Sequence, residues 1–441
     1  MRFKASDVAA ATGGKLVGPD QDIDGASIDS RGIRPGQLFV PIVAERDGHD
    51  FIDGALAGGA TAYLTAQAGD RGKPDATAIQ VADTALALAD LGRAARARLS
   101  GPVVGVTGSV GKTSTKDLLA AVLATTYVTA ANERSFNNEL GLPLTLLGAP
   151  DNTEAVVVEM GARGIGHIAL LCDIARPTVG IVTRVEGVHL ELFGDIDAVA
   201  QAKGELIEAL PADGLAVLNA DHPVVAAMAQ RSAAPVLTFG LASGADVYAE
   251  NIVMDSELRA SFTLHTPWGT APVALEARGE HQVANALAAA AAAGGIGVSV
   301  EQIAAGLGGA AISGLRMELS RTHAGVQILN DAYNANPTSM SAALDSFATL
   351  AAGRRVAVLG VMAELGADAA AQHVAITARA RSLGIEVIAV ATPDYGPDAT
   401  HVDDVAAAVA ALGDLESGDA VLVKGSRVAA LERVADALSK V

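Results

Sequence analysis

Apolar and polar positions along the chain follow two alternating patterns. Short apolar runs rich in valine, such as Pro102–Val106 and Ala155–Glu159, are typical of strands that are buried on both faces of a sheet. Longer segments between such runs repeat apolar residues every three or four positions, as in Lys116–Leu123 and Asp195–Leu210, which indicates amphipathic helices. Because strands and helices alternate along the chain, the pattern predicts parallel sheets covered by helices.

The same pattern divides the chain into three sections. The first carries short elements and ends in the helix Ala85–Leu99, followed by the break Ser100-Gly101-Pro102. The second passes from strand–helix alternation into residues 245–278, which alternate as antiparallel strands do, and it ends near Ser313-Gly314. We therefore predict an α/β fold of three domains: a small α/β N-terminal domain (residues 1–98), a central parallel-sheet domain (99–313) and a C-terminal Rossmann-like α/β domain (314–441).

The composition narrows the classes of function that fit. The chain has 441 residues, and its 31 Lys and Arg against 50 Asp and Glu give a net charge of −19. A surface this acidic argues against nucleic-acid partners, because phosphate backbones need clustered cations. The single Cys172 cannot form an intramolecular disulfide, and no apolar stretch resembles a signal peptide or a membrane span. We therefore expect a cytoplasmic protein without membrane insertion.

Residues 105–113 read Gly-Val-Thr-Gly-Ser-Val-Gly-Lys-Thr between a predicted strand and a predicted helix. Glycines allow backbone N–H groups to converge on phosphate oxygens, and the helix N-terminus favours an anion. Lys112 can neutralise phosphate charge and Thr113 can bind magnesium, although Val106 stands where the strict motif has glycine. The alternative is a glycine-rich turn with a chance lysine. The segment predicts a central P-loop mononucleotide-binding domain that binds a nucleotide triphosphate, and the contacts, which the resemblance given below assigns to ATP, are Gly108, Ser109, Val110, Gly111, Lys112, Thr113 and Ser114.

Three further side chains gather near the predicted loop. Glu159 ends the next strand and could hold magnesium, and His189 follows the strand Val179–Thr183. Lys203 projects from the apolar face of its predicted helix, so it either extends its amine to water or serves a desolvated site. Taken alone, Glu159 could be a solvent-facing charge and His189 an ordinary loop histidine.

The last section carries two polar loops between a strand and a helix. Asp331-Ala332-Tyr333-Asn334-Ala335-Asn336-Pro337 supplies donors and acceptors for a nucleotide or a polar substrate, although a capped surface turn would also explain it. Lys424-Gly425-Ser426 could bind a carboxylate or a phosphate. Arg316, just past the second break, could reach phosphates from a hinge.

Together these segments resemble the Mur ligases, the ATP-dependent amide-forming enzymes of peptidoglycan precursor synthesis. The resemblance covers essentially the whole chain and rests on residues 107–113, 136–143, 331–337 and 423–427. It points to the member that joins D-alanyl-D-alanine to UDP-N-acetylmuramoyl-tripeptide through an acyl phosphate, with ATP and two magnesium ions. The resemblance thus implies a monomeric ligase that serves cell-wall biogenesis, and through it cell shape, cell division and the cell cycle.

The resemblance also assigns roles by position. It implies catalytic roles for Lys112, Lys203 and His189, with a carbamate on Lys203, and metal ligation by Thr113, Glu159, His189 and the modified Lys203. The remaining ATP contacts would be Asn285, Arg316, Asp331, Tyr333 and Asn334. Substrate contacts would come from Ser30, Arg31, Asp47, Gly48 and His49, which match the segments that hold the UDP-sugar, and from Asn137, Asn138, Asn336, Lys424 and Ser426.

Three positions depart from the family pattern, and several rivals stay open. Arg184 and Gln282 stand where asparagine is usual, and Val361 replaces an aspartate. Another Mur-type ligase, or one acting on folate or on cyanophycin-like polymers, would share this fold. A P-loop nucleotide switch would need a guanine-reading Asn-Lys-x-Asp segment, which the sequence lacks. The sequence leaves open whether the tripeptide ends in lysine or diaminopimelate, and which other D-dipeptides are accepted.

Overall fold

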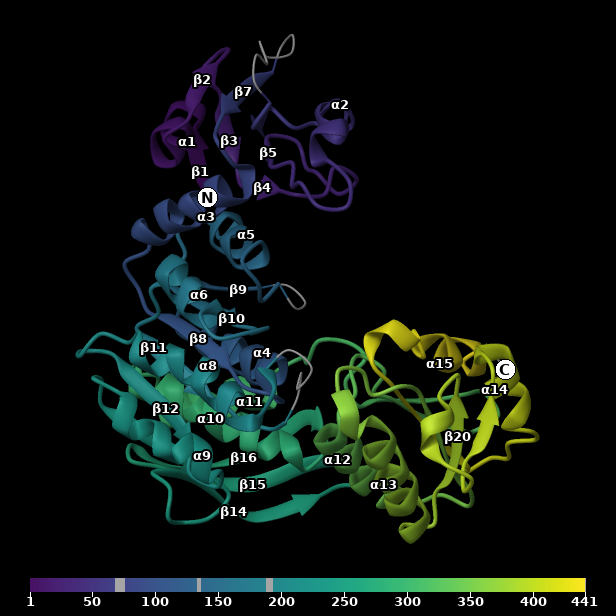
Figure 1. Cartoon of the computed structure of the whole chain (residues 1–441). Coiled ribbons are helices and arrows are strands. Elements are labelled where there is room, and N and C mark those ends of the chain that lie inside the picture. Colours follow the sequence, from purple (N-terminus) through teal and green to yellow (C-terminus); the bar gives the residue numbers. More distant parts are fainter. Residues whose placement is uncertain (68–75, 133–135, 188–192, 441) are drawn as a thin grey trace.

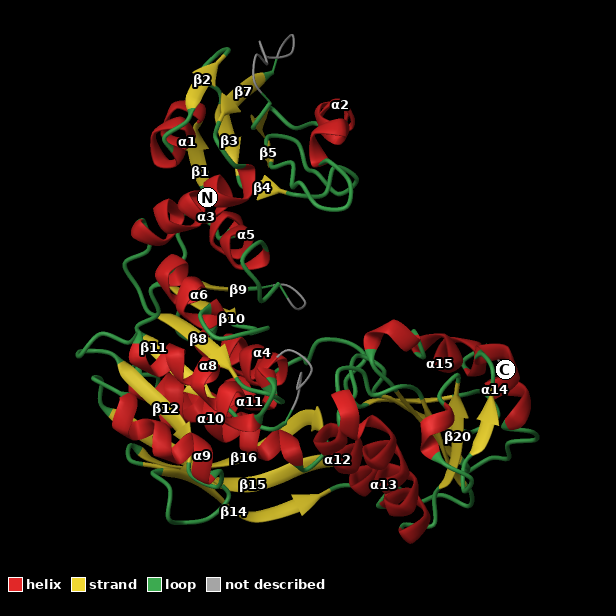
Figure 2. Ribbon diagram, in the orientation of Figure 1, coloured by secondary structure: helices red, strands yellow, loops and turns green. Residues whose placement is uncertain are grey.

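The computed structural model describes residues 1–67, 76–132, 136–187 and 193–440, and it contains three groups of strands, each with its own helices (Figure 1). The N-terminal group lies at one end of the molecule, and the C-terminal group lies beside the central one (Figure 2). Strands and helices alternate along most of the chain, so the predicted α/β class is confirmed. No helix in the described ranges is long and apolar enough to cross a membrane.

The N-terminal sheet is small and mixed. Its β4, β5, β6 and β7 run parallel, β2 pairs antiparallel with β7, and β1 pairs separately with β3. In sheet order the strands are β2 (Lys15–Val17), β7 (Thr77–Gln80), β6 (Ala62–Thr65), β5 (Leu38–Phe39) and β4 (Ala26–Ser27), with β1 (Arg2–Lys4) beside β3 (Asp22–Asp24) and helices α1 (Ala5–Thr12), α2 (Ile52–Ala57) and α3 (Thr84–Ala97).

The central sheet is parallel from β9 to β14 and continues through β15 and β16 as an antiparallel extension, as the patterns predicted. In sheet order the strands are β16 (Gly269–Arg278), β15 (Arg259–Thr266), β14 (Val247–Met254), β13 (Val236–Gly240), β12 (Leu215–Asn219), β11 (Val179–Val182), β8 (Val103–Thr107), β10 (Ala155–Glu159) and β9 (Thr129–Ala131).

Helices cover both faces of the central sheet because its strands are apolar on both sides. In β8, Val104 and Val106 face one core and Val103 faces the other. The first core includes residues of α4 (Lys112–Leu123), α10 (His281–Gly295) and α11 (Val300–Gly308), and the second includes residues of α3, α5 (Gly141–Gly148), α6 (His167–Ala175) and α8 (Ile196–Glu208). The short α9 (Pro223–Ala226) follows β12.

The C-terminal sheet is parallel except for β17, which is consistent with the predicted Rossmann-like domain. In sheet order its strands are β17 (Glu318–Arg321), β18 (Gln327–Asn330), β22 (Ala420–Lys424), β19 (Arg355–Leu359), β20 (Glu386–Val390) and β21 (Thr400–Val402), and its helices are α12 (Pro337–Ala348), α13 (Ala369–Ser382), α14 (Val405–Ala411) and α15 (Glu432–Leu438).

One contact crosses the first predicted domain boundary and another lies at the second, and the residue limits of the domains stay a prediction. The N-terminal ammonium of Met1 donates to the carbonyls of Leu147 and Ala149, at 2.8 and 2.6 Å, next to α5. At the second boundary, the backbone N–H of Ser313 donates to Asp117 of α4 at 2.8 Å. This bond fastens the start of the linker to the central domain.

The turn between β14 and β15 docks on the C-terminal domain. Its Leu258 is 1% exposed and belongs to the apolar cluster that contains Met317, Met340 and Phe347 of the C-terminal domain. Leu258 adopts a left-handed backbone with φ of 65°, a conformation that non-glycine residues rarely take. Burial of this leucine therefore ties the two domains together and holds the turn in a strained shape.

Replacing Leu258 with alanine is expected to weaken this docking. The change removes buried methyl groups from a packed cluster, which typically costs 2–5 kcal/mol. We expect a melting temperature lower by several degrees and a larger radius of gyration in X-ray scattering. Val253→Ala is the matched control, because Val253 lies on the same hairpin but is 64% exposed. Unchanged melting and size in the Leu258 variant would contradict the docking role.

Candidate active site

The loop between β8 and α4 can be built only with glycine at two positions. Gly108 has φ of 150°, and a Cβ atom there would overlap the hydroxyl of Thr183. Gly111 has φ of 85°, and a Cβ atom there would overlap the amide oxygen of Asn285. The backbone therefore packs tightly against β11 and α10 and leaves its other side to a cleft.

The segment after β11 holds this loop in place. The N–H of Ser109 donates to the carbonyl of Arg184 at 2.7 Å, and the Thr183 hydroxyl donates to the carbonyl of Val110 at 2.6 Å. The Ser109 hydroxyl donates to the carbonyl of Glu186 at 3.1 Å and accepts from its N–H at 2.8 Å. The loop is thus fixed before any phosphate binds, which lowers the cost of ordering it on binding.

Lys112 and Thr113 are the first residues of α4. Lys112 contacts the loop, and Thr113 contacts Glu159. The Lys112 amine donates to the carbonyls of Gly108 and Ser109, at 2.7 and 3.3 Å, so it lies over the loop. The Thr113 hydroxyl donates to Glu159 at 2.7 Å, and the amide of Asn137 donates to the other oxygen of the same carboxylate at 2.7 Å. Glu159 is 2% exposed, so a single carboxylate is positioned beside the loop by two polar partners.

These residues fit a magnesium ion that arrives with nucleotide. Within the described ranges, His, Cys, Asp and Glu do not assemble in threes as a protein-only metal site. Magnesium commonly needs only one or two carboxylates when phosphates and water complete its shell. Thr113 and Glu159 supply a hydroxyl and a carboxylate at the loop, which is that kind of donor set.

Lys203 of α8 is buried and lines the same cleft as Lys112. Its side chain lines the cleft and is 3% exposed, so the alternative of an amine that reaches bulk water does not hold. Burial, and then the positive charge of Lys112, hold the pKa of Lys203 well below its ordinary value. Burial therefore makes the charged form of this amine costlier than it is in water.

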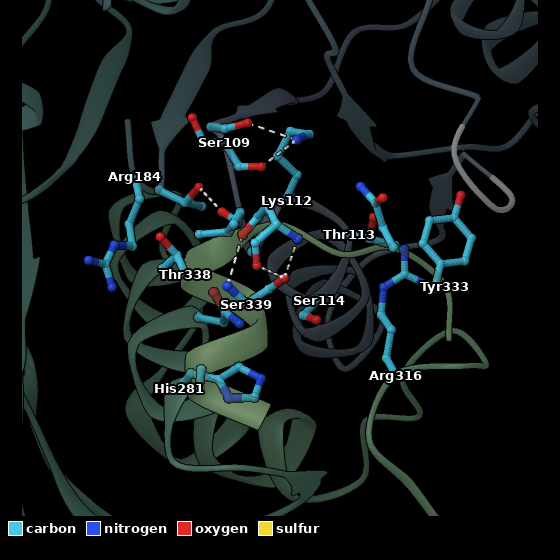
Figure 3. A pocket seen from close by; sticks show the side chains of 18 of the residues that line it. Ser109, Lys112, Thr113, Ser114, Arg184, His281, Arg316, Tyr333, Thr338 and Ser339 are labelled. Carbon is cyan, nitrogen blue, oxygen red and sulfur yellow. Dashed lines mark hydrogen bonds between the residues drawn. The ribbon is translucent and has the colours of Figure 1, made fainter. Parts of the chain in front are cut away.

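A cleft of about 870 Å³ lies between the central and C-terminal domains (Figure 3). Predicted site residues from both domains line it. They include Gly108 to Ser114, Asn137, Asn138, Glu159, Lys203, Asn285, Arg316, Asp331, Tyr333, Asn334, Asn336, Lys424 and Ser426. Asn285 is held by a hydrogen bond to Gln282 at 2.9 Å, and Gln282 in turn contacts Ser114 at 3.4 Å. Residues far apart in the sequence therefore share one wall.

The C-terminal side of the cleft contains a stacked cation and a buried ion pair. The Arg316 guanidinium lies 3.8 Å from the centre of the Tyr333 ring, and both residues line the cleft. The Lys424 amine contacts Asp331 at 2.5 Å and the carbonyl of Asn334 at 2.9 Å, and Lys424 is 2% exposed. Lys424 therefore holds the polar loop together in this structure, while Arg316 presents its charge to the cleft.

Two remaining residues of the polar loops are used structurally. The Asn336 side chain accepts from the N–H of Ser339 at 2.8 Å and caps α12. The Ser426 hydroxyl donates to the carbonyl of Ala335 at 3.3 Å and accepts from the N–H of Ala363 at 2.9 Å. Their predicted contacts with substrate stay a prediction.

The predicted UDP-sugar residues do not line this cleft; they lie in the N-terminal domain. Asp29 and Arg31 form a two-point ion pair at 2.9 Å, which lowers the pKa of Asp29 to about 2. The His49 ring contacts Asp47 at 2.6 Å through Nδ1 and accepts from the N–H of Ala66 through Nε2 at 3.0 Å. Because both ring nitrogens of His49 have partners, this side chain stabilises the loop that contains Gly48. The contacts predicted between a sugar and Ser30, Arg31, Asp47, Gly48 and His49 stay a prediction.

His189 lies outside the described residues. The cleft also contains residues that the sequence patterns missed, which include Arg163, His167, Asn219, Thr338 and Ser339. Asn219 ends β12, so the rule that functional groups gather at carboxyl ends of parallel strands could have found it. Thr338 and Ser339 begin α12, and only the placement of the domains brings them to the loop (Figure 3).

Comparison with known proteins agrees with this site. The Mur ligase family, catalytic domain matches residues 22–96, the Mur ligase middle domain matches 106–293, and the Mur ligase, glutamate ligase domain matches 315–427. The chain is 42% identical to the UDP-N-acetylmuramoyl-tripeptide--D-alanyl-D-alanine ligase of Mycobacterium tuberculosis, in an alignment that covers 93% of this chain and 91% of that protein.

Solved structures show the same architecture. MurF from Acinetobacter baumannii superposes with a TM-score of 0.91 at 29% identity, over 100% of this chain and 99% of that one. MurF ligase from Thermotoga maritima in complex with ADP gives a TM-score of 0.82 at 29% identity, over 94% and 97% of the two chains. The sequence, the fold and the arrangement of the cleft therefore lead to one conclusion: the chain belongs to the Mur ligase family.

Proposed function

We propose that this chain is the ATP-dependent ligase that joins D-alanyl-D-alanine to UDP-N-acetylmuramoyl-tripeptide in peptidoglycan synthesis. The observation that carries the proposal is the single cleft in which the phosphate loop, Glu159 and Lys203 of the central domain face Arg316 and Asp331 of the C-terminal domain. The name of the Mycobacterium tuberculosis relative supports this substrate pair. The ADP complex of the Thermotoga maritima relative supports ATP as the nucleotide.

The reaction needs two displacements. A terminal carboxylate oxygen of the tripeptide attacks the γ-phosphorus of ATP, the bond to the β-phosphate oxygen breaks, and ADP leaves. The dipeptide amine then attacks the acyl carbon, loses a proton and expels inorganic phosphate. Lys112 offsets negative charge on the transferred phosphoryl group, and Thr113 with Glu159 would hold magnesium, which neutralises more of that charge.

The chain must also keep water from the acyl phosphate, because that intermediate hydrolyses readily. The linker after Ser313 suits a hinge, since Leu315 and Met317 adopt left-handed φ angles of 62° and 52°. These backbone shapes are held by bonds from their N–H groups to Glu318 and Asp331, at 3.0 and 3.2 Å. Closure about this linker would cover the phosphate loop.

Lys203 is proposed to carry a carbamate, and two magnesium ions are proposed to bind in the working enzyme. An uncharged amine is the form that reacts with carbon dioxide, and burial lowers the pKa of Lys203 in the direction of that form. The modification would replace the amine with an anion in the cleft that Lys112 also lines and so add a ligand for a metal ion. His189 is proposed as a further metal-site and catalytic residue.

The rival functions fit less well. A nucleotide switch has no use for a second polar wall in the C-terminal domain, and the chain belongs to a ligase family. A ligase for folate or another polymer would not account for the substrates named for the Mycobacterium tuberculosis relative. We further propose that the enzyme works as a monomer, because one chain supplies both walls of the cleft.

A phosphate-release assay tests the proposed reaction. With ATP and UDP-N-acetylmuramoyl-tripeptide, release is expected only when D-alanyl-D-alanine is present, and neither glutamate nor a diamino acid should replace it. The product should gain the mass of the dipeptide less one water. Release without the tripeptide, or with another amine alone, would contradict the assignment.

Replacing Lys203 with alanine tests the carbamate. We expect turnover to fall at least a hundredfold, with partial recovery on addition of a short carboxylic acid. In ¹³C-bicarbonate, the parent protein should give a carbamate NMR signal that the variant lacks. Lys116→Gln is the control, because Lys116 is another buried lysine that donates to the carbonyl of Asn132 at 2.8 Å. Full turnover in Lys203→Ala would exclude the role.

A further inference from the structure

The end of β10 is paired unequally on its two sides. On the β8 side the ladder continues to the end of the strand, because Glu159 lies opposite Val106 and the N–H of Met160 donates to the carbonyl of Val106 at 2.8 Å. On the β9 side the register stops at the pair Val157 and Ala131. On that side Glu159 therefore lies beyond the last residue that has a strand partner.

An asparagine side chain provides the bond that β9 no longer supplies. In a parallel ladder the N–H groups of successive residues point to opposite neighbours. Since the N–H of Met160 points to β8, the N–H of Glu159 points to the β9 side, where it donates to the side-chain oxygen of Asn132 at 2.9 Å. Asn132 directly follows Ala131, the last residue of β9. Its side chain thus extends the pairing of β9 with β10 by one hydrogen bond.

Asn132 is itself held firmly. It is 2% exposed, and its backbone carbonyl accepts from the buried amine of Lys116 on α4 at 2.8 Å. A buried backbone N–H that lacks an acceptor is costly, so the bond from Glu159 to Asn132 is a strong restraint on the folded chain. Asn132 therefore fixes the backbone of Glu159 relative to α4, the helix that begins with Lys112.

The carboxylate of Glu159 is held by other groups. Thr113 donates to one oxygen and the amide of Asn137 donates to the other, both at 2.7 Å. These two bonds orient the carboxylate, whereas the bond to Asn132 fixes the point on the backbone from which the side chain starts. A ligand that is held in place before a metal ion arrives binds the ion more tightly, because less freedom is lost on binding.

We propose that Asn132 is a positioning residue for the magnesium ion that accompanies ATP, and that it acts by fixing the backbone of Glu159 rather than by touching the ion. The inference rests on the proposed function, because it needs a complex of metal and nucleotide at the phosphate loop. Removing a group that holds a metal ligand in place typically weakens metal binding by about 10–100-fold. Loss of the Asn132 oxygen should have an effect at the lower end of this range, since Thr113 and Asn137 still hold the carboxylate.

Binding of the non-hydrolysable ATP analogue adenylyl imidodiphosphate, measured by calorimetry in Mg²⁺ and in EDTA, tests the proposal. In the parent protein, Mg²⁺ should tighten the binding of the analogue. Asn132→Ala removes the accepting oxygen, so the dissociation constant in Mg²⁺ should rise by about tenfold. The dissociation constant in EDTA should stay nearly unchanged, which also shows that the variant is folded.

Two further variants complete the experiment. Asn132→Asp keeps an accepting oxygen, and the amine of Lys116 offsets the added charge, so this variant should recover most of the affinity in Mg²⁺. Gln327→Ala is the matched control. Gln327 is also a buried amide, 6% exposed, and it donates to the carbonyl of Ala351 at 2.9 Å, but it belongs to β18 of the C-terminal domain. This control should bind the analogue as the parent does.

Each outcome bears on one of the two proposals. Parent-like binding of Asn132→Ala in Mg²⁺, an equal loss of affinity in EDTA, a similar loss in Gln327→Ala, or no recovery in Asn132→Asp would overturn the inference and leave the proposed reaction standing. A parent protein that binds the analogue equally well with and without Mg²⁺ would instead overturn the place of magnesium in the proposed function.

Discussion

The parallel pairing of β8 with β10 and β11 is the constraint on which the site depends. In this register Glu159 lies opposite Val106, and Val182 lies opposite Thr107, so the three strands end together. The phosphate loop, the carboxylate that accepts from Thr113 and the segment that clasps Ser109 therefore meet at one edge. A shift of one residue would turn each side chain to the other face of the sheet and would separate these groups.

Local charge in the cleft differs from the charge of the whole chain. The protein carries a net charge of −19, yet its cleft is lined by several lysines and arginines. Some of these cations are neutralised by partners, as Lys424 is by Asp331, and others face the cleft. Because fields in a partly enclosed cleft are screened less than those at the surface, a few placed cations can bind phosphates and carboxylates on an acidic protein.

The domains are joined at two kinds of contact. The bond between Asp117 and Ser313 fixes the start of the linker to α4, which begins with Lys112. The burial of Leu258 fastens the β14–β15 turn to the C-terminal core. The helix that follows the phosphate loop and the start of the linker to the C-terminal domain therefore share a direct contact.

The sequence by itself determined the α/β class, the parallel order of strand and helix, and the phosphate loop, because these depend on local periodicity and on residues adjacent in the chain. It also identified Lys203 as anomalous, since a lysine on an apolar helix face is visible in the spacing alone. Only the tertiary structure decided that Lys203 and Lys112 line one cleft, that Lys424 is bound to Asp331, and that residues of α12 line the same cleft as Arg184. Those contacts join residues far apart in the chain, and their geometry is set by the packing of sheets and domains, which local pattern does not encode.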